Sequence, residues 1–79
     1  MAQIDIENIE RIEKERNSIH EKVYTTYSVF EKDNKRFLQI DTYGRNDREN
    51  PGKISQSIQV DKMAAKSIVR LLIREFDLL

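Results

Sequence analysis

A chain of 79 residues is long enough for one small domain, but it is too short for its core to contribute much net stability. It has no cysteine and one histidine, which excludes disulfides and argues against a structural zinc site. Fourteen acidic residues balance fourteen basic ones, which argues against a simple polybasic nucleic-acid binder and against an acidic mimic of DNA.

Membrane segments are also not expected. No apolar run approaches the roughly 20 residues that a membrane-spanning helix needs, and no signal-peptide pattern opens the chain. We therefore expect a cytoplasmic protein with a single domain over residues 1–79. Because neither disulfides nor metal support so small a core, we expect it to associate as a homodimer.

The first predicted element is a helix within residues 1–21. Ile9, Ile12 and Ile19 recur at a spacing that forms one narrow apolar stripe on a helix, and Asp5 is placed to cap its start. The stripe is too short for a coiled coil. It is expected to pack either on its own domain or on a twin subunit, so the three isoleucines are predicted interface residues.

The next predicted element is a hairpin around the sequence KDNK, which lies between two runs of β-branched and aromatic residues. Asp33 and Asn34 both tolerate the left-handed conformation, so a two-residue turn is expected there, and it sets Phe30 opposite Phe37. The apolar face then holds Val23, Thr25, Tyr27, Val29, Leu38, Ile40 and Thr42. The other face holds Tyr24, Thr26, Ser28, Phe30, Phe37, Gln39, Asp41 and Tyr43.

A third strand is predicted from Ile54 to Val60, because apolar and polar residues alternate there and place Ile54, Ile58 and Val60 on one side. The predicted sheet therefore covers residues 22–60 and has three antiparallel strands. A helix over residues 61–79 follows, with Asp61 as its N-cap. The expected fold class is α+β, in the order helix-strand-strand-strand-helix, with the C-terminal helix packed on one sheet face.

The final helix has more apolar surface than one sheet face can cover. Its apolar positions span an arc of roughly 220°, about twice what packing on a single sheet requires. The surplus is expected to meet the first helix, a second copy of the chain, or both. Leu71 and Leu78 are the predicted residues of the dimer seam.

A row of basic residues follows the same helix. Lys62, Lys66, Arg70 and Arg74 recur every four residues on the side away from the apolar arc. Such a row is suited to contacting phosphates along a nucleic-acid backbone. The alternative is an ordinary solvated helix face.

The sequence GRNDRENPGK, residues 44–53, connects the last two predicted strands. It lacks the first glycine of a Walker-type phosphate loop and precedes a strand rather than a helix, so a nucleotide cradle is not expected. Two interpretations remain: a mobile, solvated hairpin loop, or a binding finger that presents Arg45, Arg48 and Lys53.

The polar face of the predicted sheet has aromatic residues at both ends, so it suits either the stacking of bases or contact with a protein. Tyr43 and Gln39 are its predicted binding residues. Asp41 lies in the middle, where a single-strand binder usually carries basic groups. Composition alone does not decide between these two partners.

No catalytic set is recognisable. His20 lies beside Glu21 but lacks the second histidine of a zinc protease helix, and the chain has no cysteine nucleophile. We expect no enzyme activity, no metal, no cofactor and no small-molecule substrate.

The strand motif FLQIDTYG at residues 37–44, followed by SQSIQ at 55–59 and an alanine-containing helix, resembles a family of small bacterial and phage-type proteins. The resemblance covers about half of the chain, and most members of that family are uncharacterised, so it implies a compact module and no particular activity. A three-stranded sheet with a C-terminal helix is also similar in outline to several small DNA-binding domains, which usually have a basic sheet face.

Two main functions remain from the sequence, beside a purely structural role as a subunit of a larger assembly. The first is a nucleic-acid-associated regulatory or accessory role, in which the helix row and the loop contact phosphates. The second is a protein-binding inhibitor or adaptor of phage or mobile-element type that acts on a larger enzyme through the polar sheet face.

Overall fold

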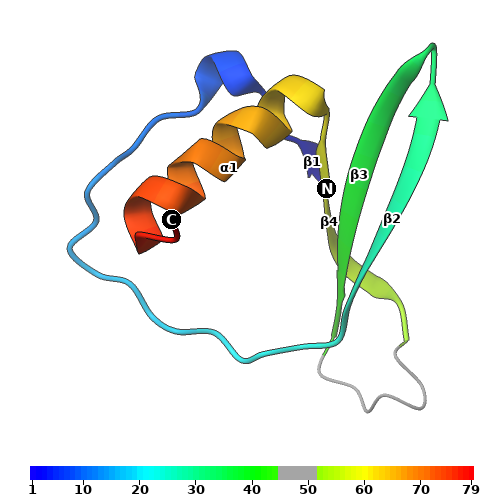
Figure 1. Cartoon of the computed structure of the whole chain (residues 1–79). Coiled ribbons are helices and arrows are strands. Elements are labelled where there is room, and N and C mark those ends of the chain that lie inside the picture. The colour runs from blue at the N-terminus through cyan, green and yellow to red at the C-terminus, as the bar shows by residue number, and fades with distance from the viewer. Residues whose placement is uncertain (45–51) are drawn as a thin grey trace.

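The structure is a computed structural model that describes residues 1–44 and 52–79. It has an α+β fold with one four-stranded sheet and one C-terminal helix (Figure 1). The elements are β1 (Ala2–Gln3), η1 (Ile6–Asn8), β2 (Thr25–Lys32), β3 (Lys35–Tyr43), β4 (Ile54–Val60) and α1 (Lys62–Phe76). The strand order is β1-β4-β3-β2, with β1 parallel to β4 and the other pairs antiparallel.

The β2–β3 hairpin has the predicted register. Phe30 lies opposite Phe37, and the turn residues Asp33 and Asn34 have φ angles of 54° and 64°. Both turn residues are therefore left-handed, the geometry of a two-residue turn whose twist matches that of the strands. The hairpin prediction is confirmed. The sequence could predict it because turn chemistry and strand pattern are both local properties.

Substitutions at Asn34 are expected to act in opposite directions. Asn34→Gly should raise the free energy of unfolding by about 0.5 kcal/mol, since glycine adopts a positive φ at no steric cost. Asn34→Val should lower it by about 1–2 kcal/mol, since a β-branched residue resists that conformation. Urea unfolding measures both effects. Asn17 lies in an irregular segment without a positive φ, so Asn17→Val is the matched control, and equal small effects at both positions would show that the turn stabilises nothing.

The β3–β4 pairing contains an irregularity that the sequence pattern did not predict. Thr42 lies opposite Gln56, but Tyr43 lies opposite Ile54, so Ser55 is an extra residue without a partner. A bulge of this kind interrupts the alternation of faces. The prediction that Ile54 shares a face with Ile58 and Val60 is therefore wrong, because the register brings it opposite Tyr43.

A fourth strand was also missed. Residues of β1 pair with β4, Ala2 opposite Ile58 and Gln3 opposite Gln59, and the amide of Ile4 donates to the carbonyl of Gln59 at 2.9 Å. Two residues are too few to show a period in the sequence. The sheet therefore has four strands rather than the predicted three.

The predicted N-terminal helix within residues 1–21 is wrong. Only η1 is helical, with the Asp5 side chain accepting from the amide of Glu7 at 3.0 Å, and residues 9–24 contain no helix or strand. Helices in proteins depend on packing of their apolar face. Here Ile19 is 101% exposed, and the segment passes around the outside of α1 before it reaches the sheet (Figure 1).

The C-terminal helix begins where predicted. The Asp61 carboxylate accepts from the amide of Ala64 at 2.9 Å, which confirms the N-cap. The helix ends at Phe76 because Asp77 adopts a left-handed conformation (φ 53°). Its amide and that of Leu78 both donate to the carbonyl of Ile73, a common way to close a helix.

Very little apolar surface is buried. Ala64 is the one fully buried apolar residue in the described part of the chain. The helix α1 starts beside β4 and then diverges from the sheet (Figure 1), so the predicted packing of the helix on one sheet face holds only near its first turns. The uncovered side is called here the apolar sheet face, and it consists of Tyr27, Val29, Leu38, Ile40, Ile58 and Val60.

Candidate binding surfaces

The polar sheet face is organised around Asp41, which is 7% exposed. Its Oδ1 accepts hydrogen bonds from Gln39 Nε2 at 2.9 Å and from the Ser57 hydroxyl, while Gln39 Nε2 also lies 3.1 Å from Oδ2. Gln59 Nε2 in turn donates to Gln39 Oε1 at 2.8 Å. The network joins β3 to β4 and satisfies a carboxylate that would be costly to bury alone.

Two aromatic pairs lie at the ends of this network. The rings of Tyr24 and Tyr43 have centroids 5.3 Å apart at an interplanar angle of 49°, and the Tyr43 hydroxyl lies 3.3 Å from Thr26 Oγ1. At the other end the rings of Phe30 and Phe37 are stacked, with centroids also 5.3 Å apart. On the polar sheet face the aromatic rings therefore pack in pairs, and the amide and carboxylate groups between them are hydrogen-bonded to one another.

The two predicted binding residues on this face differ in how freely they can contact a partner. Tyr43 is half-buried, with its ring against Tyr24. Gln39 has its amide nitrogen engaged with Asp41 and its oxygen engaged with Gln59. Gln39 therefore orients the surface and offers little free hydrogen-bonding capacity to a partner.

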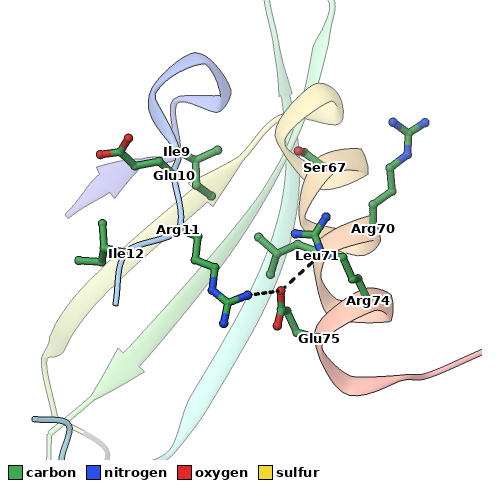
Figure 2. Close-up of a pocket in the computed structure, with 9 residues that line it drawn as sticks. All are labelled: Ile9, Glu10, Arg11, Ile12, Ser67, Arg70, Leu71, Arg74 and Glu75. Carbon is green, nitrogen blue, oxygen red and sulfur yellow. Dashed lines mark hydrogen bonds and ion pairs between the residues drawn. The ribbon is translucent and has the colours of Figure 1, made fainter. Parts of the chain in front are cut away.

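A hollow of about 580 Å³ lies between the N-terminal segment and α1 (Figure 2). Its lining residues are Ile9, Glu10, Arg11, Ile12, Ser67, Arg70, Leu71, Arg74 and Glu75. Glu75 Oε2 lies 3.5 Å from Arg11 Nη1 and 3.4 Å from Arg74 Nε, so one carboxylate ties the segment to the helix. This hollow brings three predicted interface residues and two predicted phosphate-binding residues into one place.

The remaining predicted interface residues do not join that group. Ile19 is in solvent on the irregular segment, and Leu78 is exposed beyond the end of α1. Ile9, Ile12 and Leu71 therefore line one hollow within the chain, and their role at a dimer interface stays a prediction.

The basic row of α1 is exposed along its whole length, but its members have different surroundings. Lys62 lies at the start of the helix beside the sheet, Arg70 and Arg74 border the hollow of Figure 2, and Arg74 is paired with Glu75. Lys66 is exposed between them.

The predicted loop finger is described only at its edges. Arg45 and Arg48, and most of the sequence GRNDRENPGK, lie outside the described residues. Lys53 is exposed just before β4, and Gly44 is half-buried just after β3. The proposal of a mobile, recognising loop stays a prediction.

A second, almost wholly apolar hollow of about 250 Å³ was not predicted. It lies where the apolar sheet face meets the start of α1, and it is lined by Val29, Arg36, Phe37, Leu38, Val60, Asp61, Lys62 and Ala65. The signal that could have located it is the surplus apolar arc of the last helix. That surplus indicates an uncovered surface without showing which part of the sheet lies beneath it.

Comparison of the chain with protein-family models, with curated proteins and with solved structures finds no match. The resemblance of the strand motif to small bacterial and phage-type proteins therefore remains a prediction. Within residues 1–44 and 52–79 there is no group of three or more His, Cys, Asp or Glu side chains that could hold a metal ion. Nor does that part of the chain contain a helix long and apolar enough to cross a membrane.

Proposed function

We propose that the chain is a non-enzymatic, nucleic-acid-associated regulatory or accessory protein. The observation that carries the proposal is the row of four basic residues on α1, all of them exposed. Successive cations are separated by about 6 Å along the helix axis, so the row extends over about 18 Å. A cationic row of that length, which turns by about 120° around the helix axis, can neutralise several phosphates along a strand.

The charge of the whole helix α1 also supports this role. The helix from Lys62 to Phe76 contains four basic residues and one acidic residue, although the whole chain is neutral. Like charges four residues apart mildly destabilise a helix, so the row brings no benefit to folding. Contacts to phosphates alone predict weak binding that is sensitive to salt and largely indifferent to base sequence.

The double substitution Lys66→Gln and Arg70→Gln tests the role of the row. If both residues contact phosphates, the slope of log affinity against log salt should become shallower by about two, since each phosphate contact contributes about −0.9 for duplex DNA. Fluorescence anisotropy with a labelled 20-base-pair duplex and with the matching single strand measures this slope.

A charge-matched control distinguishes the row from net charge. Lys14→Gln with Lys22→Gln removes the same charge from the exposed irregular segment and should leave the slope unchanged. Equal effects of the two double variants would mean that binding follows net charge only. No binding of either probe by the unmodified chain would rule out the proposed function.

The polar sheet face favours a second candidate function, a protein-binding inhibitor or adaptor. The carboxylate of Asp41 lies at its centre, a poor position for a surface that follows a phosphate backbone. Aromatic pairs with amides and hydroxyls between them suit a protein interface. A pull-down from the native cell with and without nuclease separates the two candidates: a stoichiometric protein that survives nuclease supports the adaptor, and partners lost on treatment support the nucleic-acid role.

A further inference from the structure

Two apolar surfaces of the chain do not meet each other. One is the apolar sheet face, on which Tyr27 remains 74% exposed. The other is a stripe along α1, called here the helix stripe, made of Ala65, Val69, Leu72 and Phe76, with Phe76 69% exposed. Ala65 borders the apolar hollow of the sheet, but the helix then diverges from the sheet (Figure 1), and Val69 and Phe76 are 53% and 69% exposed.

The size of the molecule shows how much surface is left open. Its accessible surface is 7698 Å², whereas a compact monomer of 9.4 kDa is expected to expose about 5000 Å². The radius of gyration is 14.8 Å against about 12 Å expected for this length. Part of the excess comes from the irregular segment. Another part comes from the apolar sheet face and the helix stripe, where Tyr27, Val69 and Phe76 are 74%, 53% and 69% exposed, and a standard interface buries only roughly 800 Å² of each partner.

Another side of the helix is linked to the N-terminal segment rather than to the sheet. Leu71 and Glu75 line one wall of the hollow whose other wall holds Ile9 and Arg11, and the Arg11–Glu75 ion pair at 3.5 Å joins the two walls (Figure 2). Ala64, on the same side of the helix as Leu71, is fully buried. Closing the helix stripe onto its own sheet would break these contacts.

We infer that a second copy of this chain covers the open surfaces, with the helix stripe of each chain packed on the apolar sheet face of the other. One chain offers both halves of the contact, and a two-fold axis satisfies both at once, which is the ordinary symmetry of a homodimer. The seam therefore runs along Val69, Leu72 and Phe76, rather than through the predicted Leu71 and Leu78.

Charge fits the same arrangement. Arg36 and Lys62 stand at the rim of the apolar hollow, while Asp77 follows Phe76 at the end of the helix stripe. Glu75 is already paired with Arg11 and Arg74, so a helix end that docks at this rim brings the Asp77 carboxylate to basic groups. The neutral chain also has no net charge that would oppose its association with a copy of itself.

Isotope-filtered NMR on a mixed sample tests the inference with the unmodified chain. Equal amounts of ¹³C,¹⁵N-labelled and unlabelled protein are unfolded together and refolded, and NOEs between labelled and unlabelled chains are recorded. Contacts between the Phe76 ring and the methyl groups of Val29, Ile40 or Ile58 are expected in the filtered spectrum. The inference is overturned if those contacts occur only within one chain, since the helix then closes on its own sheet. It is equally overturned if they are absent from every spectrum.

Discussion

The double substitution Val69→Ser and Phe76→Ser is expected to abolish cooperative unfolding at micromolar protein concentration. Burying a large apolar side chain contributes about 1.5–3 kcal/mol, and in a symmetric dimer each substitution removes two such contributions. That loss exceeds the roughly 3–5 kcal/mol of net stability that a core of this size supplies. Thermal melts followed by circular dichroism at several concentrations measure it. The unmodified protein should also show a melting temperature that rises with concentration.

The control places two serines on the solvent side of the same helix. Lys66→Ser with Arg70→Ser loses more helix propensity than the test variant but leaves the helix stripe intact, so this variant should still melt cooperatively. If the Val69 and Phe76 variant melts like the control, the helix stripe is a solvated surface.

The substitution Asp41→Asn is expected to lower the free energy of unfolding by about 2–3 kcal/mol, the usual range for hydrogen bonds to a buried charge. Asparagine keeps the shape but turns an acceptor oxygen into a donor that faces Gln39 Nε2. Urea unfolding measures the change. The exposed turn residue Asp33 supplies the control, since Asp33→Asn should have little effect.

A compensating change makes the test specific. Adding Gln39→Glu to Asp41→Asn exchanges donor and acceptor, so that residue 39 accepts from both residue 41 and Gln59. About 1–2 kcal/mol of the loss should return if the network acts as a unit. A double variant that is less stable than either single variant would contradict the exchange of donor and acceptor between residues 39 and 41.

The sequence predicted those parts of the fold that are determined by residues close together in the chain. Asp33 and Asn34 determine the hairpin because their conformational preference and the flanking strand patterns agree. Asp61 marks the start of α1 because its cap reaches only to Ala64. The strand β1 and the divergence of α1 depend on tertiary contacts, so no local pattern reveals them.

The N-terminal segment shows how a periodic pattern can mislead. Ile9, Ile12 and Ile19 have helical spacing. Only Ile9 and Ile12 line the hollow beside Leu71, and Ile19 is fully exposed. A marginal helix without continuous packing does not form. The prediction that the isoleucines are interface residues stays a prediction for Ile9 and Ile12, which line that hollow, while Ile19 lies in solvent and the predicted helix does not form.

For the binding surfaces, the sequence predicts which side chains are exposed more readily than it predicts the hydrogen bonds between them. The basic row was visible because one helix period is a local property. The hydrogen bonds of Asp41 to Gln39 and Ser57 depend on the register of β3 against β4, which includes the irregularity at Ser55. Neither the register nor the irregularity can be read from strand propensity, so Gln39 was assigned to a partner rather than to the network.

The inferred dimer and the proposed function are compatible in space. The basic row and the helix stripe occupy different sides of α1, and the polar sheet face is the reverse of the apolar sheet face. Two copies that cover each other's apolar surfaces would leave the polar sheet face and Lys66, Arg70 and Arg74 of the basic row exposed, while Lys62 lies at the rim of the contact. A pair of basic rows would also engage nucleic acid at two places, which strengthens weak contacts.

Sedimentation equilibrium of the unmodified protein at micromolar concentration tests the central claim, that the fold is complete only as two copies. The account predicts a single species of about twice the 9.4 kDa chain mass, dissociating only where the protein also loses its structure. A stable, cooperatively folded species at 9.4 kDa would contradict it.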